Sequence, residues 1–405
     1  MEDTVLVVNC GSSSLKLALF DGQHRKLASA VAERLNQNDA FARIAGDKDT
    51  IPLKPGTSHN AALEAMVSAF RDRQLITSVP AAIGHRVVHG GETFREAVLI
   101  DEGVISAIEA CAGLAPLHNP VNLSGIRATL ALFPGVPQAA VFDTAFHQTL
   151  PKHAFLYALP EAWYQHWGVR RYGFHGTSHA FMAAEAARLL ARTPATTSVI
   201  SAHLGNGCSV TAIRDGSSVD TSMGLTPLEG LVMGTRSGDV DPGLFDFLRS
   251  KGVAADEVHR VLNQESGLLG LSGQTNDMRS LCELADHGHE PSRTAIDVFC
   301  FRLARYIGAM MASLRHLDAL VFTGGIGENS ARVRQDTISH LHLMGFELSE
   351  DLNKHHGKFS DRRIDSAGSR FPVLVIPTNE ELAIAREASR LAGAADPASP
   401  PPVTR

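Results

Sequence analysis

The sequence predicts an α/β fold made of two related halves, and three observations support it. Strand-like and helix-like patterns alternate along most of the 405 residues. A continuous apolar run at residues 4–8 breaks at a turn of small polar residues and is followed by a second strand-like run at 15–20. The same strand-turn-strand pattern returns at residues 198–214. At roughly 100–200 residues per domain, this length corresponds to two or three domains.

The two strand-turn-strand segments match in spacing as well as in composition. Gly11 precedes Asp21 by ten residues, and Gly205 precedes Asp215 by ten residues. In both segments an Asp-Gly pair, which favours tight hairpin turns, ends the second strand. We therefore expect each half to open with two successive hairpins, although a chance similarity between two hairpins is the alternative.

Helices are expected to fill most of the remaining chain. Residues 61–70 carry apolar side chains three and four positions apart, which is the spacing of one helix face. A longer buried helix face is expected from Ile296 to Leu314. The last segment, residues 393–405, is rich in Ala, Pro and Ser, and we expect it to be a disordered tail.

Composition and charge argue against several classes of protein. The net charge of -6 lacks the basic surplus of a nucleic-acid-binding protein. No apolar run approaches the ~18 residues of a membrane span, and the first residues lack the pattern of a secretory signal. The five cysteines are widely spaced and form no C-x-x-C pair, which favours free thiols. We therefore expect a cytoplasmic protein without nucleic-acid or membrane partners.

Three turns of small residues are candidate phosphate-binding segments. Residues 9–16 offer backbone N–H groups, hydroxyls, an amide and an ammonium, but they lack the Walker A spacing. Residues 204–207 occupy the equivalent place in the second half. Residues 323–329 form a glycine turn between a predicted strand and a predicted helix, a setting that suits a phosphate or nucleotide. Taken singly, a serine-rich turn is more often only a turn.

Charged side chains beside glycines are candidates for handling anions. Arg86 ends a predicted strand before Gly90-Gly91, and Arg236 lies among small residues. Arginine in such a setting often clamps a carboxylate or phosphate, although an ordinary surface arginine is the alternative. His175 precedes a glycine, and Asp143 directly follows an apolar strand.

These motifs together resemble the acetate kinase family, which belongs to a superfamily with sugar kinases, Hsp70 and actin. The matching segments run in the family's order from residue 8 to residue 381: 8–16, 84–91, 114–120, 142–147, 171–179, 203–207, 234–239, 322–329 and 377–381. The resemblance implies a duplicated actin/Hsp70-like (RNase H-like) fold with a nucleotide cleft between two domains. It places one domain at residues 1–147 plus 380–392 and the other at 148–379.

The resemblance also implies site residues, by position in this sequence. Catalytic roles fall on Arg86, Asp143, His175 and Arg236. Arg86 also binds the substrate, together with an acetate-methyl pocket of Val88, Leu117, Phe174 and Pro227. Asn9 and Glu380 are implied to hold Mg²⁺, with Mn²⁺ as an alternative. ATP or ADP is implied to contact Ser12, Ser14, Lys16, His203, Leu204, Gly205, Asn206, Gly207, Asp277, Met278, Arg279, Gly325, Ile326, Gly327, Glu328 and Asn329. A homodimer is implied as well.

The implied reaction is the reversible phosphorylation of acetate by ATP to acetyl phosphate, through direct in-line transfer. Acetate is already ionised at pH 7, so the nucleophile needs no general base, and Asp143 is left to orient an arginine or to join the magnesium shell. A propionate or other short-chain fatty acid kinase is one alternative. A nucleotide-driven binding module of the actin/Hsp70 type is another. Departures from the family at Val121 and at residues 273–277 leave the choice of nucleotide base open.

One segment has an unusual aromatic content. Both tryptophans and three of the four tyrosines lie within residues 157–172, directly before Phe174 and His175. A patch in the core or at a dimer interface is the simpler interpretation. In either case, tryptophan emission is expected to report on this region and to change when nucleotide and acetate bind.

Overall fold

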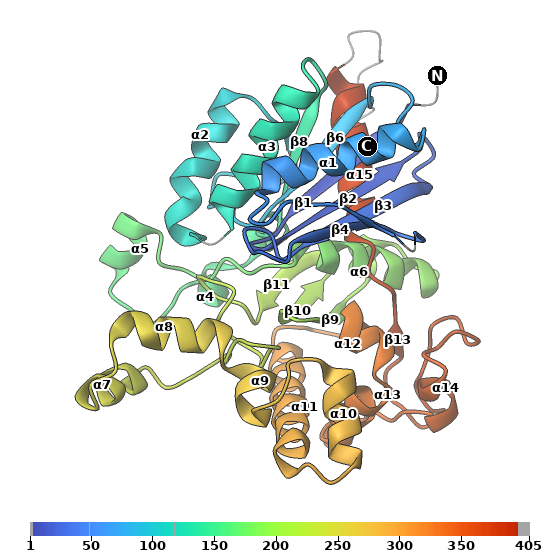
Figure 1. Cartoon of the computed structure of the whole chain (residues 1–405). Helices are drawn as coiled ribbons and strands as arrows, with labels where there is room; N and C mark the ends of the chain where they lie inside the picture. The colour runs from blue at the N-terminus through green and yellow to red at the C-terminus, as the bar shows by residue number, and fades with distance from the viewer. Residues whose placement is uncertain (1–2, 48, 117, 396–405) are drawn as a thin grey trace. The chain divides into compact units, whose positions relative to one another are not determined.

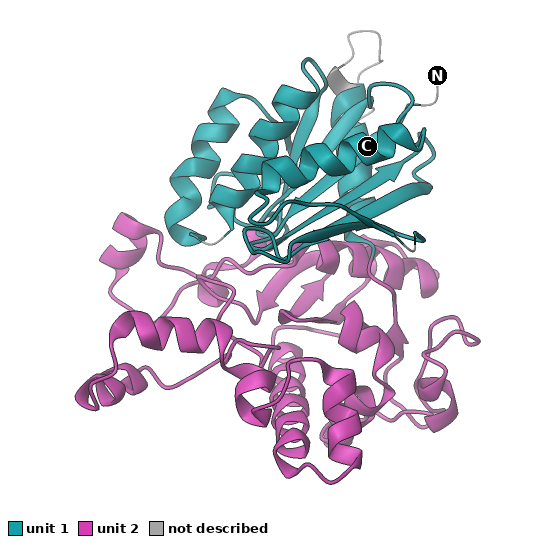
Figure 2. Ribbon diagram, in the orientation of Figure 1, with its two compact units in different colours: residues 1–146, 379–405 teal, residues 147–378 magenta. Residues whose placement is uncertain are grey.

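The chain divides into two compact units, unit 1 at residues 1–146 and 379–405 and unit 2 at residues 147–378 (Figure 2). A computed structural model describes residues 3–47, 49–116 and 118–395 (Figure 1). The secondary structure alternates between strands and helices in both units, as expected for an α/β fold.

Unit 1 is a mixed sheet with helices on both faces. Its strands are β1 Val5–Cys10, β2 Ser14–Phe20, β3 Lys26–Glu33, β4 Phe41–Ile44, β5 Thr50–Ile51, β6 Ala82–Val87, β7 Val98–Leu99 and β8 Gln138–Phe142. Its helices are α1 His59–Asp72, α2 Glu102–Ala110, the 3-10 helix η1 Cys111–Leu114, α3 Asn119–Leu132 and α15 Glu380–Ala395. The strand order is β5-β4-β3-β2-β1-β6-β8-β7, in which β1, β6 and β8 are parallel neighbours.

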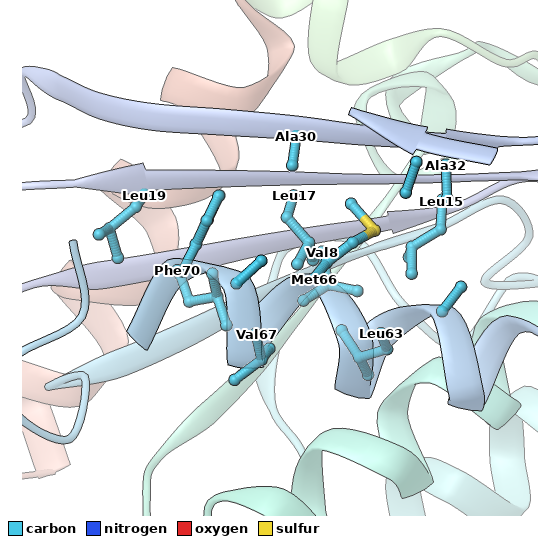
Figure 3. Packing of buried hydrophobic residues seen from close by; sticks show 14 of the residues in the cluster. Val8, Leu15, Leu17, Leu19, Ala30, Ala32, Leu63, Met66, Val67 and Phe70 are labelled. Carbon is cyan, nitrogen blue, oxygen red and sulfur yellow. The ribbon is translucent and has the colours of Figure 1, made fainter. Parts of the chain in front are cut away.

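Strand β1 is buried on both faces because its apolar residues alternate between two cores. Leu6 and Val8 pack with the α1 face of Leu63, Met66 and other apolar residues (Figure 3). Val5 belongs to the opposite core, which contains residues of α15. This alternation follows from the two-residue period of a strand. Because both faces of β1 are buried, its sequence is a continuous apolar run.

Helix α15 lies close against β6, and glycine makes this possible. A Cβ atom at Gly84 would lie 2.6 Å from Cγ2 of Ile384, so any side chain there would push the helix away. The helix begins at Glu380, and Asn379 Oδ1 accepts a hydrogen bond from the Leu382 N–H at that end. The packing therefore sets where the first carboxylate of α15 lies relative to the end of β6.

Unit 2 contains a smaller sheet and most of the helices. Its strands are β9 Val199–Leu204, β10 Cys208–Arg214, β11 Ser217–Thr221, β12 Ala319–Thr323 and β13 Val373–Val375. Its α-helices are α4 Lys152–Phe155, α5 Glu161–Trp167, α6 Gly176–Leu189, α7 Gly243–Ser250, α8 Ala255–Gln264, α9 Gly267–Ser272, α10 Met278–Asp286, α11 Glu290–Met311, α12 Gly324–Asn329, α13 Ala331–Ser339 and α14 Glu350–Lys354. The 3-10 helices η3 Pro194–Thr196 and η4 His342–Met344 lie in this unit as well, and η2 Ala145–Thr149 spans the boundary.

The two sheets share one topology. Unit 2 has the order β11-β10-β9-β12-β13, and unit 1 contains β3-β2-β1-β6-β8. In each series the first two pairings are antiparallel and the last two are parallel. The duplicated halves and their paired hairpins, expected from the matching spacings, are confirmed at the level of strand order and direction.

Some local expectations are wrong. The glycine run after β12 is itself the short helix α12 rather than a turn. Helix α11 ends at Met311, so Leu314 lies beyond it. Helix α15 continues to Ala395 because Ala-rich sequence favours helix and the first proline is Pro397, so residues 393–395 are not part of a tail. The rest of the expected tail, residues 396–405, lies outside the described residues.

The aromatic segment is largely a surface feature. Trp163 and Trp167 on α5 are 43% and 65% exposed, which contradicts a core position for both tryptophans. Their ring centroids lie 6.1 Å apart. Tyr172, at the end of the segment, is buried. All five cysteines are free, as the sequence predicts.

Candidate active site

In unit 1, Arg86 and Asp143 form a two-point ion pair. Arg86 lies near the end of β6 opposite Val141 of β8, and Asp143 directly follows β8. Arg86 Nε donates to Asp143 Oδ1 at 2.9 Å and Nη2 donates to Oδ2 at 2.6 Å. Burial alone would lower the pKa of Arg86, but the Asp143 and Glu380 carboxylates raise it overall. The guanidinium is thus a fixed positive charge with its plane set by the aspartate.

Two buried asparagines hold the segment that follows β6. Asn122 Oδ1 accepts from the Val88 N–H at 3.0 Å, and its Nδ2 donates to the Cys10 carbonyl at 2.8 Å. Asn119 bonds both the N–H and the carbonyl of His89. These residues of α3 tie the ends of β1 and β6 together. Asn119 belongs to the family-matching segment 114–120, but sequence reasoning gave neither asparagine a role, although two amides on the first turn of a helix after a proline-containing loop were a usable signal.

The neighbouring hairpin presents Asn9 and Lys16 as a cross-strand pair. Asn9 is partly buried, whereas Ser12 and Lys16 are exposed. The turn is closed by the Gly11 N–H, which donates to the Ser14 carbonyl at 2.8 Å. Val88 is buried near the end of β6. Leu117, which the resemblance assigns to the substrate, lies outside the described residues.

In unit 2, His175 and His203 stack at the start of α6. His175 adopts a left-handed backbone conformation with φ of 56° and directly precedes the helix. Its ring lies 4.3 Å from that of His203, centroid to centroid. His175 Nδ1 is 2.9 Å from Ser209 Oγ, and His203 Nδ1 is 2.8 Å from Ser178 Oγ. The ring of His175 is therefore oriented by contacts from β9 and β10, and Ser178 of α6 in turn contacts His203. Phe174, just before it, is buried.

Arg236 lies beside His175 across Gly207. A Cβ atom at Gly207 would be 2.9 Å from Arg236 Nη2 and 3.4 Å from His175 Nε2. Arg236 Nη1 donates to the Pro227 carbonyl at 2.6 Å, which fixes the guanidinium. The absence of a side chain at Gly207 thus leaves a cation and an imidazole edge next to bare backbone, an arrangement suited to anionic oxygens.

A cavity of about 700 Å³ in unit 2 collects many of the predicted nucleotide residues. Those that line it are Gly205, Asn206, Asp277, Met278, Arg279, Gly325, Ile326 and Asn329. The sequence missed Asn276, Cys282, Ser330, Ala331 and Arg332, which line it as well. Leu204, Gly207, Gly327, Glu328 and His203 are not among its lining residues. A lining that combines glycine backbone, amide side chains and apolar side chains suits a nucleoside.

Two carboxylates near this cavity are held by backbone N–H groups. Asp277 caps α10 and accepts from the Ser280 N–H at 2.8 Å, and this bond, with the Ser280 hydroxyl, lowers its pKa. Glu328 Oε1 accepts from the N–H groups of Gly324 and Thr378. The Glu328 carboxylate therefore closes α12 onto the segment after β13.

Residues 4–386 match the family model described as the acetokinase family. The chain belongs to the acetokinase family. The acetate kinase of Chromobacterium violaceum is 50% identical over 400 residues, which are 98% of this chain and 100% of that protein. The acetate kinase of Deinococcus deserti is 51% identical over 396 residues, covering 96% of this chain and 98% of that protein.

Solved structures within the acetokinase fold include enzymes named for two different acids. The structure of a propionate kinase from Francisella tularensis has a TM-score of 0.91 at 43% identity and covers 96% of this chain and 100% of that one. The structure of Porphyromonas gingivalis acetate kinase has a TM-score of 0.88 at 40% identity, covering 96% and 99%. In the described part of this chain, no helix is long and apolar enough to cross a membrane.

Proposed function

We propose that this protein transfers the γ-phosphoryl group of ATP to acetate, giving ADP and acetyl phosphate, and that it also catalyses the reverse reaction. An acetate oxygen attacks Pγ, and the bond from Pγ to the bridging oxygen breaks, with its electron pair leaving on ADP. The observation that carries the proposal is the group formed by His175, Gly207 and Arg236 in the unit that holds the nucleoside-sized cavity. Full-length similarity to proteins named acetate kinase supports it.

Electrostatic stabilisation supplies the catalysis in this proposal. An anion approaches a polyanion, so the barrier falls when positive charge and hydrogen-bond donors stand ready for the equatorial oxygens. Arg236 neutralises those oxygens, and His175 donates to one of them. Arg86 binds the acetate carboxylate, and Asp143 orients Arg86 through the two bonds between their side chains. No group needs to remove a proton from the nucleophile.

Asn9 and Glu380 fit a magnesium site. Amide and carboxylate oxygens are the hard ligands that Mg²⁺ prefers. Among the described residues no cluster of three or more His, Cys, Asp or Glu side chains suits a metal, so water and phosphate oxygens would complete the shell. When bound, the ion offsets phosphate charge. Ser12, Ser14 and Lys16 are proposed to contact phosphate, and the cavity residues of unit 2 are proposed to hold adenosine.

Propionate is the second candidate substrate, because a solved structure 43% identical to this chain is named a propionate kinase. A homodimer in the cytoplasm remains the expected setting of the enzyme. The exposed apolar side chains Trp167 and Phe247 of unit 2 are compatible with a subunit interface, and light scattering after size exclusion tests the dimer.

A panel of formate, acetate, propionate and butyrate with MgATP tests the proposal. Hydroxylamine traps any acyl phosphate as a hydroxamate, and ATP formed from acetyl phosphate and ADP reports on the reverse direction. We expect acetate to give the highest kcat/KM. Failure to form a hydroxamate from any of these acids would refute the proposal, whereas a preference for propionate would select the second candidate.

A further inference from the structure

His179 is a fully buried histidine whose role the proposed mechanism leaves open. It lies on α6, four residues after His175, which directly precedes the helix, and the rings of both histidines have partners on β9 and β10. His179 Nδ1 is 3.0 Å from Ser201 Oγ on β9, and its Nε2 is 2.8 Å from Ser209 Oγ on β10. Each ring nitrogen therefore has a serine hydroxyl as partner.

Ser209 links the two histidines. Its hydroxyl oxygen lies 2.8 Å from His179 Nε2 and 2.9 Å from His175 Nδ1. Strand register explains this position, because Ser209 pairs with His203, two residues after Ser201 along β9. The side chains form one continuous hydrogen-bond chain in the order Ser201, His179, Ser209, His175.

The charge state of His179 limits how protons can be arranged along this chain. Burial, and then the nearby His147 and His203 rings, hold the pKa of His179 well below its usual value. A neutral imidazole has one donor and one acceptor, and each serine hydroxyl has one proton. Toward His175, the Ser209 hydroxyl either donates to Nδ1 or accepts from Nδ1–H, and a proton on His179 Nε2 leaves the Ser209 proton available for His175.

The surroundings of His175 favour polarisation toward it. In the opposite direction, His175 Nδ1–H would donate to Ser209. Its Nε2 would then have no proton to donate to anionic oxygens, or the ring would be a cation beside Arg236 and stacked on His203. A like charge and a stacked imidazole both disfavour the cation. When Ser209 instead donates to Nδ1, the proton of neutral His175 sits on Nε2, which would lie 3.4 Å from a Cβ atom at Gly207.

We propose that His179 is a positioning residue that acts through Ser209 to keep His175 in the neutral Nε2–H tautomer, ready to donate to the transferring phosphoryl group. In this arrangement, the Nε2–H of His175 is an oriented hydrogen-bond donor, and the ring does not have to be protonated first. It deepens the proposed function and rests on it for the role of His175. The tautomer of His175 is a property of the unliganded protein, so it can be tested without measuring activity.

Two amide substitutions of His179 distinguish a role in positioning His175 from a role in core packing alone. Glutamine places an N–H where Nε2 lies and asparagine places its amide near Nδ1, so His179→Gln retains the bond to Ser209 and His179→Asn loses it. Ser209→Ala breaks the same bond from the other side. We expect His179→Asn and Ser209→Ala to lower kcat about 10- to 100-fold, the usual cost of losing the partner that orients a functional histidine. The KM values for ATP and acetate should stay within about threefold, and His179→Gln should recover most of kcat.

The direct readout is ¹⁵N NMR of protein labelled at histidine, with the His175 signals assigned by their loss in His175→Gln. Wild type at pH 7.5 should show His175 protonated at Nε2 and not at Nδ1, and His179→Asn and Ser209→Ala should show a mixture of tautomers. His259→Asn, at an exposed position of α8, serves as the control that should change neither the His175 signals nor the rate.

Two results would overturn the proposal. One is an Nδ1–H or doubly protonated His175 in wild type, which can be seen even if the His179 variants do not fold. The other is a kcat within twofold of wild type in well-folded Ser209→Ala. If wild type forms no acyl phosphate from any acid while the His175 tautomer is as expected, the proposed function fails and the tautomer assignment stands.

Discussion

The carboxylate of Asp143 accepts two parallel hydrogen bonds from the guanidinium of Arg86, 57 residues earlier in the chain. Arg86 keeps 23% of its side chain exposed, whereas Asp143 keeps 3%, so the arginine alone of the pair has a surface available to a substrate. In the proposed mechanism, Asp143 therefore orients Arg86, and its effect on activity should depend on Arg86.

Because of this dependence, we expect the effects of substituting Asp143 and Arg86 on kcat/KM to be strongly non-additive. Asp143→Asn should lower kcat/KM for acetate about 10- to 100-fold by releasing the guanidinium plane, and Arg86→Ala should lower it at least as much. The double variant should be little worse than Arg86→Ala alone, because the aspartate acts through the arginine. Additive losses in this double-mutant cycle would show that Asp143 has a separate role, such as one in the magnesium shell.

Arg236 is expected to affect kcat far more than nucleotide affinity. Removing a phosphoryl-stabilising arginine costs about 10³–10⁵ in rate, so Arg236→Ala should lose about that factor while ADP binding by calorimetry changes little. Arg236→Lys should restore only part of the activity, because an ammonium cannot form the planar fork. Arg249→Ala, at an exposed position of α7, is the control. An Arg236→Ala rate within tenfold of wild type would remove this residue from the mechanism.

Val88 is expected to select acetate over propionate. The Val88 side chain is buried and stiff at χ1, and the backbone N–H of Val88 donates a hydrogen bond to Asn122. Because backbone and side chain are both held, the side chain cannot rotate aside for an extra methylene. Wild type should prefer acetate roughly 10- to 200-fold in kcat/KM. Val88→Ala should narrow this ratio mainly by improving propionate. If the ratio is the same in both proteins, Val88 does not contact the acyl chain.

Arg334 is expected to control nucleotide binding without touching the nucleotide. This fully buried guanidinium donates to the carbonyls of Gly327 and Glu328 at the end of α12, and to Asn353. Burial lowers its pKa to about 10. Arg334→Met should cost about 3–5 kcal/mol of unfolding free energy, measured in urea, by leaving these acceptors unmatched. Because α12 lines the cavity, the KM for ATP should rise several-fold while kcat changes little. An unchanged KM would contradict the anchoring role.

The buried histidine His85 is expected to make the folding stability of unit 1 sensitive to acid. Burial lowers its pKa to about 4, against the opposing hydrogen bond with Gln138. In the unfolded chain the pKa is near 6.5, so the unfolded state binds the proton first as pH falls. Stability is therefore lost between about pH 6.5 and pH 4, by about 3 kcal/mol for this group. Urea unfolding at pH 7.5 and pH 4.5 should show a smaller loss in His85→Gln than in wild type. Equal losses would rule this histidine out as the cause.

The sequence predicted the parts of the molecule that depend on local pattern. A window of about ten residues is enough to predict the strands, the Asp-Gly turns and the arginine at the end of β6. The Arg86–Asp143 contact was not readable, because it requires β6 and β8 to be parallel neighbours in one register. Arg334 was missed for a similar reason: three of its acceptors are backbone carbonyls, which carry no sequence signal. The short helix α12 escaped recognition because glycine disfavours helix and Arg334 bonds its terminal carbonyls from outside.

The shared strand order also places residues of different chemistry at equivalent points. Asn9 pairs with Lys16 in the first hairpin of unit 1, and His203 pairs with Ser209 in the first hairpin of unit 2. Both pairs lie one step from the turn. The duplicated fold therefore presents an amide with an ammonium in one copy and an imidazole with a hydroxyl in the other, at corresponding positions. In the proposed mechanism these two positions have different tasks, metal and phosphate binding in unit 1 and proton placement in unit 2.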